Sequence, residues 1–294
     1  MSEIVAYYPG CTLKTKARAL EVAGLGSLDA LGVRVVELER WNCCGAVFPL
    51  AQDDLLHLLA PVRDLIRAKD AGAGTLTTLC SQCYNTLARA NRLVREDGEK
   101  RRTLNAFMTE ETDYHGEVEV VHFLDLLRRE IGWERLRARV PRPLVGLKLA
   151  AFHGCALLRP AEVAIGGQGG GPAVLRELCA ALGDGVVSYA AETECCGSYQ
   201  GVANPPAVLG QSARVLGSAR SAGADALVVS CPLCDYNLGR GAAGAGAAPI
   251  PVYYFTQLLA LALGLGPESC GFELGPDPRR TLLERRELVR PAAA

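Results

Sequence analysis

Ten of the twelve cysteines in this chain of 294 residues fall into two sets with the same order. Each set has a single cysteine, then an adjacent pair, then a Cys-x-x-Cys motif. The first set is Cys11, Cys43, Cys44, Cys80 and Cys83, and the second is Cys155, Cys195, Cys196, Cys231 and Cys234. Thiolates bind soft metal ions and iron–sulfur clusters. The two sets therefore predict two metal-containing sites.

The number of cysteines in each set bears on the kind of metal. A structural zinc ion takes four ligands in a tetrahedron, and an adjacent cysteine pair cannot easily place both sulfurs on one small ion. A cluster of several metal atoms can use both, so the pattern favours iron–sulfur ligation over zinc or structural disulfides. Ordinary cubane clusters also take four cysteines. The fifth is therefore either a spare redox thiol or a ligand of an unusual cluster, and spacing leaves this open.

The residues around the cysteines repeat as well. Four pairs of segments correspond: YPGC at 8–11 with FHGC at 152–155, NCCG at 42–45 with ECCG at 194–197, CSQCYNTL at 80–87 with CPLCDYNL at 231–238, and VVHFLDLL at 120–127 with VYYFTQLL at 252–259. Such matches along both halves indicate a duplicated domain. We expect the join near Pro141 and Pro143.

Short apolar runs alternate with longer helical patterns in both halves. The expected strands are Ile4–Tyr7, Val33–Leu38, Thr75–Leu79, Leu147–Phe152, Val186–Tyr189 and Ala226–Ser230, and two amphipathic helices are expected at Gln52–Lys69 and Pro206–Ala222. This alternation predicts an α/β fold with parallel sheets flanked by helices. Ligands of such folds bind outside the carboxyl ends of the strands. Every cysteine of the two sets follows an expected strand, so the topology should gather five thiols at one edge of each half.

Glycines and helix starts accompany the cysteines. Glycine tolerates the backbone geometry that lets the chain approach a bound group closely, and four glycines flank the motifs: Gly10, Gly45, Gly154 and Gly197. Cys80 and Cys231 are expected at helix starts, with Pro232 in a first turn. Helix N-termini lower the pKa of a thiol and offer N–H donors to anionic sulfur.

These motifs resemble those of HdrB, the component of heterodisulfide reductase that is built from two CCG (cysteine-rich) domains. The resemblance covers about residues 4–262. It is carried by YYPGCTLKTKA at 7–17, WNCCGA at 41–46, CSQCYNTLARAN at 80–91, ECCG at 194–197 and CPLCDYNL at 231–238. It implies an N-terminal CCG domain at 1–143, a C-terminal CCG domain at 144–266, related by pseudo-twofold symmetry, and a tail at 267–294.

The resemblance also implies cofactors and chemistry. It implies two noncubane [4Fe-4S] clusters, one held by the cysteines of each set, facing each other and reducing a disulfide, or oxidising thiols in reverse. The ten cysteines are thus expected to be both cluster ligands and catalytic residues. The implied partners are an iron–sulfur protein similar to HdrC, a flavoprotein similar to HdrA, and a disulfide or thiol substrate, either a small molecule or a sulfur-carrier protein.

Two other interpretations of the same motifs stay open. One is an electron-transfer component of a lactate or glycolate oxidation, succinate dehydrogenase or thiol:fumarate reductase system. The other is a non-enzymatic scaffold in which zinc or degraded clusters only hold the fold.

Other polar residues near the motifs each allow two interpretations. Four cations follow the first cysteine of a set: Lys14, Lys16, Arg18 and Arg159. They would attract an anionic substrate, although a solvated helix face is the favoured explanation. His153 precedes Gly154 and is a candidate catalytic proton donor, with a hydrogen-bonded wall residue as the alternative.

The remaining cysteines and histidines are expected to take no part in the chemistry. His122 is expected to pack at a helix start, and His57 and His115 to be bystanders. Cys179 is expected to be a buried small apolar residue, and Cys270 to have no role.

Composition excludes several classes of protein. The chain has 31 basic and 32 acidic side chains, and this balance argues against a nucleic-acid surface. Gly241–Pro267 contains no charge, but its apolar part, Val252–Gly266, is shorter than the about 20 residues of a membrane span, so we expect a loop and a buried helix. No signal peptide is visible, and we expect a cytoplasmic protein with reduced thiols.

Two further segments are interpreted from composition alone. The glycine-rich run GGQGGG at 166–171 lacks a nucleotide-binding order and is expected to be a loop. The arginine-rich end of the chain, Pro276–Ala294, is expected to be a frayed solvated terminus. The alternative is a helix that docks on a partner protein.

Overall fold

The computed structural model describes residues 5–46, 55–166, 173–183, 185–244, 250–274 and 277–289. It contains two four-stranded sheets in which every strand pair is parallel. The first sheet has the order β2-β1-β3-β4 and the second the order β6-β5-β7-β8. The strands are β1 Val5–Tyr7, β2 Val36–Glu37, β3 Thr75–Thr78, β4 Glu119–His122, β5 Leu149–Ala151, β6 Val186–Val187, β7 Ala226–Val229 and β8 Val252–Tyr254. The identical order confirms the duplicated α/β fold.

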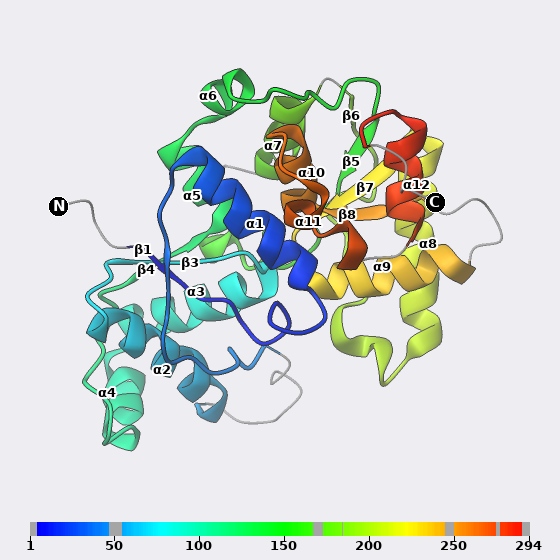
Figure 1. The fold of residues 1–294 in the computed structure, drawn as a ribbon. Coiled ribbons are helices and arrows are strands. Elements are labelled where there is room, and N and C mark those ends of the chain that lie inside the picture. Colours follow the sequence, from blue (N-terminus) through cyan, green and yellow to red (C-terminus); the bar gives the residue numbers. More distant parts are fainter. Residues whose placement is uncertain are drawn as a thin grey trace.

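Helices connect the strands and cover the sheets (Figure 1). In the first half they are α1 Arg18–Leu31, α2 Leu56–Asp70, α3 Ser81–Glu96, α4 Gly98–Phe107, α5 Phe123–Glu130 and α6 Trp133–Ala138. In the second half they are α7 Val174–Leu182, α8 Pro205–Ser221, α9 Pro232–Gly244 and α10 Phe255–Ala262, with short 3-10 turns η2 Ala161–Val163 and η4 Ser198–Gly201. The chain continues through α11 Pro267–Cys270, η5 Phe272–Leu274 and α12 Asp277–Arg285.

The helix expected at 52–69 is α2, which begins four residues later than expected, at Leu56, and ends one residue later, at Asp70. The helix expected at 206–222 is α8, which agrees within one residue at each end. Residues 52–54 lie outside the described part of the chain. On α3, buried Leu87, Ala90 and Val94 recur every three or four residues, which places one face against the sheet.

Each sheet has a fourth strand that the sequence analysis did not predict. β4 and β8 are short apolar runs that pass directly into α5 and α10. Their last residues, His122 and Tyr254, keep extended backbone geometry while they begin the next helix. The expected buried helix at Val252–Gly266 is therefore wrong for its first three residues, because these pair with β7. His122 lies at a helix start, as predicted.

The two halves pack reciprocally. Helix α1 of the first half packs on α10 of the second, and α7 of the second packs on α5 of the first. These pairs exchange equivalent elements, which is the contact pattern of a twofold axis. The α1–α10 contact is close: the Thr256 hydroxyl donates to the carbonyl of Leu20 at 3.0 Å. A Cβ on Gly24 would lie 2.7 Å from the Leu79 side chain and 3.2 Å from Thr256 of α10, so a larger residue would crowd this contact.

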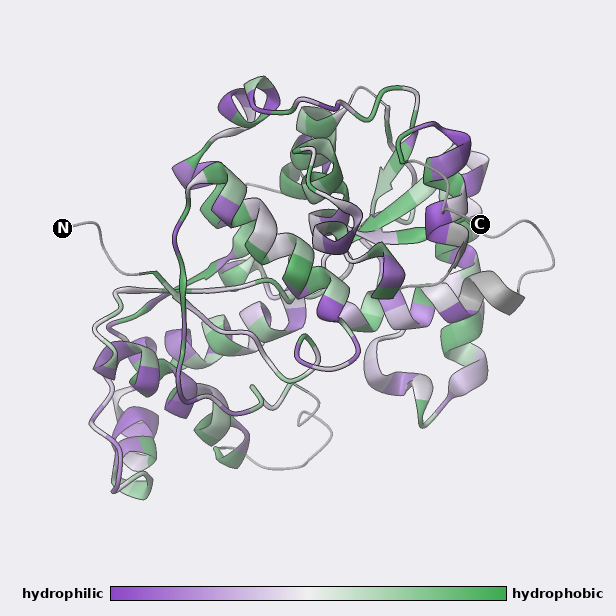
Figure 2. Cartoon of the chain, in the orientation of Figure 1, coloured by the Kyte–Doolittle hydropathy of each residue, from purple (hydrophilic) through white to green (hydrophobic). Residues whose placement is uncertain are grey.

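The end of the chain packs back on the protein. Leu283 of α12 is fully buried, and the Gln257 amide donates to the carbonyl of Cys270 at 3.2 Å. Figure 2 shows that α12 is mostly hydrophilic, whereas strands β5 and β7 are hydrophobic. The expectation of a frayed terminus is therefore wrong for residues 277–289, because polar contacts and one buried leucine fix the helix.

Two further expectations concern a membrane span and the glycine-rich run. Among the described residues, no helix is both long and apolar enough to cross a bilayer. Most of the glycine-rich run at 166–171 lies outside the described residues. The domain boundaries at 143 and 266 stay a prediction.

Candidate functional site

The first set of cysteines gathers at the carboxyl edge of the first sheet, as predicted. Cys11 follows β1, the Cys43–Cys44 pair follows β2, and Cys80 and Cys83 begin α3 after β3. The Sγ atoms of Cys11 and Cys43 are 3.5 Å apart, and those of Cys44 and Cys83 are 3.6 Å apart. Three segments distant in the sequence thus bring five thiols together.

The second set repeats this arrangement at the edge of the second sheet. Cys155 contacts Cys195, and Cys196 contacts Cys234, through thiol hydrogen bonds equivalent to those of the first set. Cys231 precedes α9, whose first residue is Pro232, as predicted. Asn237 of α9 adds an amide donor 3.5 Å from the Sγ atom of Cys196.

The two sets meet at one point. The thiols of Cys80 and Cys231, which are equivalent residues of the repeat, hydrogen-bond each other. Beside them the hydroxyls of Ser81 and Ser230 lie 2.6 Å apart. Equivalent residues in mutual contact lie next to the pseudo-twofold axis. The ten thiols therefore form two adjoining sites at the junction of the halves.

Contacts between thiols divide them into donors and acceptors. Hydrogen bonds from Cys231 and then Cys83 hold the pKa of the Cys80 thiol well below its usual range. Hydrogen bonds from Cys155 and Cys196 lower the pKa of Cys195 to about 2. The donor Cys83 has a correspondingly raised pKa. The pKa of an acceptor thiol is thus lowered at the expense of its donor, and the thiols of each site are coupled in their protonation.

Glycine backbone lies close to the sulfur atoms of each site. Gly10 has φ +73°, and a Cβ there would lie 3.0 Å from the Sγ atom of Cys83. Gly154 is its equivalent, with φ +64° and a would-be Cβ 3.5 Å from the Sγ atom of Cys234. Left-handed backbone and close approach to sulfur both favour glycine here.

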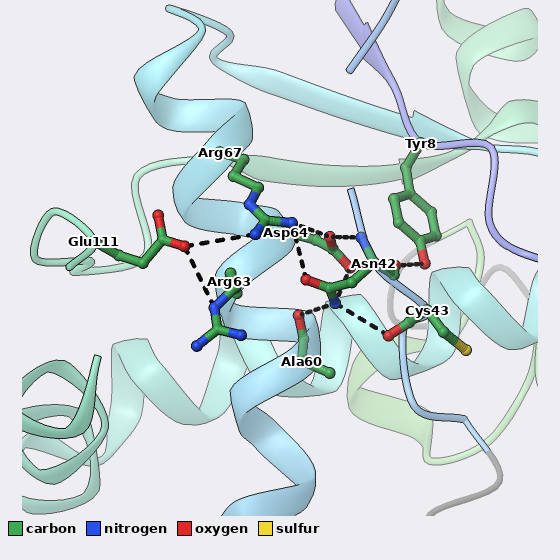
Figure 3. Close-up of polar contacts among 8 residues, drawn as sticks. All are labelled: Tyr8, Asn42, Cys43, Ala60, Arg63, Asp64, Arg67 and Glu111. Atoms are coloured by element: carbon green, nitrogen blue, oxygen red, sulfur yellow. Dashed lines mark hydrogen bonds and ion pairs between the residues drawn. The ribbon is translucent and has the colours of Figure 1, made fainter. Parts of the chain in front are cut away.

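A buried polar network holds the Cys43–Cys44 loop (Figure 3). The backbone N–H of Asn42 donates to Asp64 at 2.8 Å, and the side-chain amide of Asn42 donates to Asp64 at 3.2 Å. Arg67 donates to the Oδ1 atom of Asn42 at 3.0 Å. The Tyr8 hydroxyl donates to the Asn42 carbonyl at 2.7 Å. Asp64 is fully buried, and burial raises its pKa to about 7. Helix α2 thus anchors the residue before the cysteine pair.

The second half anchors the equivalent residue with different chemistry. Glu194 precedes the Cys195–Cys196 pair and accepts hydrogen bonds from Gln211 at 3.0 Å and Arg214 at 2.7 Å, both on α8. In the first half the loop carries the amide and the helix carries the carboxylate. In the second half the loop carries the carboxylate and the helix carries the amide. Both arrangements fix the turn that presents the adjacent cysteines.

His153 lies in the wall of the second site. It is 3 % exposed and lines a small cavity with Cys155, Cys196, Cys231 and Cys234. Neither ring nitrogen has a hydrogen-bond partner among the described residues. Burial and then Arg176 lower its pKa to about 4, so the imidazole is neutral at pH 7. The alternative of a hydrogen-bonded wall residue is therefore not what the described residues show.

The expected cations take different positions. Lys14 forms ion pairs with Glu21 at 2.8 Å and Glu37 at 2.7 Å. Lys16 and Arg18 are exposed. Arg159 donates to the carbonyl of Thr193 at 2.9 Å and so ties the Cys155 loop to the segment before Cys195.

The residues expected to be bystanders take different positions. Cys179 is buried in α7 and Cys270 is buried at the end of α11. His115 is exposed, and His57 lines a groove beside α3. The pKa of His122 is lowered to about 3 by burial, and its ring bonds the carbonyl of Leu79 at 3.2 Å.

Sequence reasoning missed two features that join the halves. Asn85 of α3 donates to the carbonyls of Ala156 at 2.9 Å and Arg159 at 2.7 Å, across to the Cys155 loop. The groove beside α3 has a volume of about 720 Å³ and runs between this helix and the second half, from Gly45 and Gln82 past Tyr199. Asn85 lies within a quoted motif, but only the contact shows its role.

The donor set fits a multi-iron cluster better than a single ion. All twelve cysteines are free. Sulfur donors and close glycine backbone in both sites, and the unpartnered ring nitrogens of His153 in the second site, are consistent with a larger anionic group.

Comparison with known proteins agrees with this geometry. The cysteine-rich domain CCG matches residues 5–88 and again 149–239. The chain is 32 % identical to the B subunit of the ferredoxin/F420H2-dependent CoB–CoM heterodisulfide reductase of Methanosarcina acetivorans, over 92 % of each chain. The chain belongs to the HdrB family. Its two CCG domains correspond to the two sheets.

Other relatives of this HdrB family member have different names. One is the 8-methylmenaquinol:fumarate reductase membrane anchor subunit of Wolinella succinogenes, 30 % identical over 92 % of this chain and 96 % of the relative. Another is a protein of Archaeoglobus profundus named as similar to the B subunit of heterodisulfide reductase, at 27 % identity over 94 % and 95 % of the chains.

A solved structure shares the fold. A hypothetical protein from Helicobacter pylori superposes with a TM-score of 0.72 at 13 % identity, over 93 % of this chain. The chain spans about half the length of that protein, 51 %. The likeness supports the two-sheet architecture of this HdrB family member.

Proposed function

We propose that this chain is the iron–sulfur component of a disulfide reductase of the heterodisulfide reductase kind. The observation that carries the proposal is the contact between Cys80 and Cys231, which makes the two sets of thiols adjoin. Each set would hold one noncubane [4Fe-4S] cluster, and two such clusters would supply one-electron chemistry to the two sulfurs of a bound disulfide. Cleavage takes two electrons and two protons and releases two thiols; thiol oxidation is the reverse.

The chain's own residues would hold the clusters and shape their surroundings. The ten cysteines are the proposed ligands, with Gly10 and Gly154 leaving room for the sulfurs. Neutral His153 carries one N–H without an acceptor among the described residues, and a cluster sulfide would accept it. In this proposal His153 orients and stabilises, since its neutral ring does not deliver a proton at pH 7.

The groove beside α3 is the proposed route for the substrate. It begins at Gly45 and Gln82, next to both sites, and its volume of about 720 Å³ suits a small molecule or the end of a carrier protein. Thr86 lines its wall and is half-buried. We expect Thr86→Trp to block disulfide reduction while iron content stays unchanged.

The decisive test is metal analysis of oxygen-free protein with disulfide assays. We expect about eight irons and eight acid-labile sulfides per chain, and a change in the spin signal when substrate thiols are added. Zinc near stoichiometry with little iron would reject the proposal. Electrons would come from partners similar to HdrC and HdrA, and co-purification tests this separately.

A second candidate function is electron transfer without disulfide cleavage. The relative named as a fumarate reductase membrane anchor subunit favours it. In this case the clusters would form and respond to an electron donor, but thiols would leave their spin signal unchanged.

A further inference from the structure

One arginine of the C-terminal helix is buried beside the second site. Arg279 of α12 is 5 % exposed, a rare position for an arginine unless its charge is paired. It forms an ion pair with Asp235. Its guanidinium carbon lies 5.6 Å from the ring centre of Tyr254, a cation–π contact, and its carbonyl accepts the hydroxyl of Tyr253.

Asp235 connects this arginine to the cysteines. It directly follows Cys234 in the first turn of α9, and its backbone N–H donates to the carbonyl of Cys231 at 3.1 Å. The hydroxyl of Tyr254 also donates to its carboxylate. Arg279, Asp235 and Tyr254 therefore join three elements, α12, α9 and the end of β8, at the turn that carries two thiols.

The first half has no such charged group at the equivalent place. Tyr84 occupies the position of Asp235, and His122 occupies that of Tyr254. The rings of Tyr84 and His122 pack edge to face, 5.6 Å between centres. The turn with Cys80 and Cys83 is thus held by two uncharged rings, and the turn with Cys231 and Cys234 by an ion pair.

Two further contacts dock α12. Leu283 is fully buried, and Arg286 forms an ion pair with Asp225 at 2.8 Å. Arg286 is much more exposed than Arg279, with 42 % of its side chain accessible against 6 %. Asp225 precedes β7, at the end opposite the cysteines, so this second pair holds the same helix but lies away from the thiols.

We propose that Arg279 is a positioning residue of the second site: through Asp235 it fixes the first turn of α9 and its thiols Cys231 and Cys234. The C-terminal helix then contributes to the second site only, and the two sites differ in the charged groups beside them. This inference rests on the proposed cluster function. Removing the guanidinium takes one positive charge from beside the second site, and this loss would disfavour an added electron there.

The test compares three variants of the loaded protein: Arg279→Gln, Arg279→Lys and the control Arg286→Gln. Each is made in a Cys83→Ser background, which isolates the second site, and in a Cys234→Ser background, which isolates the first. Redox titration followed by spin spectroscopy reads each site. We expect Arg279→Gln to shift the reduction potential of the second site to a more negative value and to leave that of the first site unchanged. Arg279→Lys should keep the potential of the second site near that of the parent. Arg286→Gln should change neither potential.

An unchanged second site in Arg279→Gln, or an equal shift in Arg286→Gln, would overturn the inference. A second readout does not depend on clusters. In cluster-free full-length chain, Arg279→Gln should speed alkylation of Cys231 and Cys234 about tenfold through local opening, with Cys83 of the first set unaffected. Equal rates in variant and parent would reject the positioning role. Absence of iron in the parent would reject the proposed function alone.

Discussion

The hydroxyls of Ser81 and Ser230 lie 2.6 Å apart across the boundary between the two halves. Ser81 follows Cys80 and Ser230 precedes Cys231, so this bond lies beside the contact between the two thiol sets. Ser81 also donates its backbone N–H to the carbonyl of Ser230 at 3.3 Å. Both side chains are buried. The two sites are therefore held together by hydrogen bonds that water does not reach.

We expect the serine pair to show coupled stability. Ser81→Ala and Ser230→Ala should each lower the free energy of unfolding by ~1 kcal/mol, and the double variant should lose less than the sum. Denaturant titration of the four proteins measures the coupling. The control is Ser212→Ala, since this buried hydroxyl has no hydrogen-bond partner in the described residues and its loss should cost little. Strict additivity would contradict direct bonding.

Single cysteine variants should affect one site each. Cys83→Ser and Cys234→Ser should each reduce iron from about eight to about four per chain, because each thiol belongs to one set. Iron and sulfide analysis after anaerobic purification measures this. Cys179→Ala is the control, since Cys179 is buried in α7, away from both sets. Loss of all iron in either serine variant would show that the sites are not independent.

A methyl group at Gly10 should expel the first cluster. Gly10→Ala places a Cβ 3.0 Å from the Sγ atom of Cys83, so the first site should lose its iron while the second keeps about four atoms. Gly32→Ala is matched in backbone angle, φ +73°, but has no atom within 4 Å of the new Cβ. Gly32→Ala should lower the free energy of unfolding by ~1 kcal/mol through backbone strain and leave the iron content unchanged. Equal iron loss in both variants would mean that strain, not contact, matters.

Asn85 should influence the site of the other half. Asn85→Ala removes two hydrogen bonds to the Cys155 loop and leaves the buried carbonyl of Ala156 unpaired, at ~2 kcal/mol. We expect faster loss of iron from the second site under chelator. Asn91→Ala is a similarly buried control whose side chain bonds Val118 and Tyr114, both of its own half. It should destabilise the chain without this selective loss; the same selectivity in both would refute the bridging role.

His122 should make stability depend on pH. Its pKa is lowered from the usual 6.5 to about 3 in the folded chain. The unfolded chain then takes up a proton first as pH falls, so the folded state is favoured above pH 6.5 and loses this advantage between pH 6.5 and 3. His122→Asn keeps a helix-capping side chain but does not titrate there. Its unfolding free energy, measured against the parent at about pH 5 and 7, should fall less; parallel decreases would contradict the assignment.

Much of this protein was determined by the sequence itself. Repeated cysteine motifs indicated the duplication, and alternation of short apolar runs with helices indicated parallel sheets, whose carboxyl ends collect the residues that follow them. Three strands of each sheet follow from such local patterns. β4 and β8 do not, because three or four residues that run directly into a helix carry no periodicity of their own.

Only the tertiary structure decided how the two sites meet and what surrounds them. The contacts of Ser81 with Ser230 and of Asn85 with the Cys155 loop join residues more than 70 positions apart. Arg279 lies in a segment whose composition predicted a solvated end, yet it is buried against Asp235. Such contacts depend on how the finished helices and strands pack together. This packing is determined by shape and charge across the whole fold, and a local sequence pattern does not contain that information.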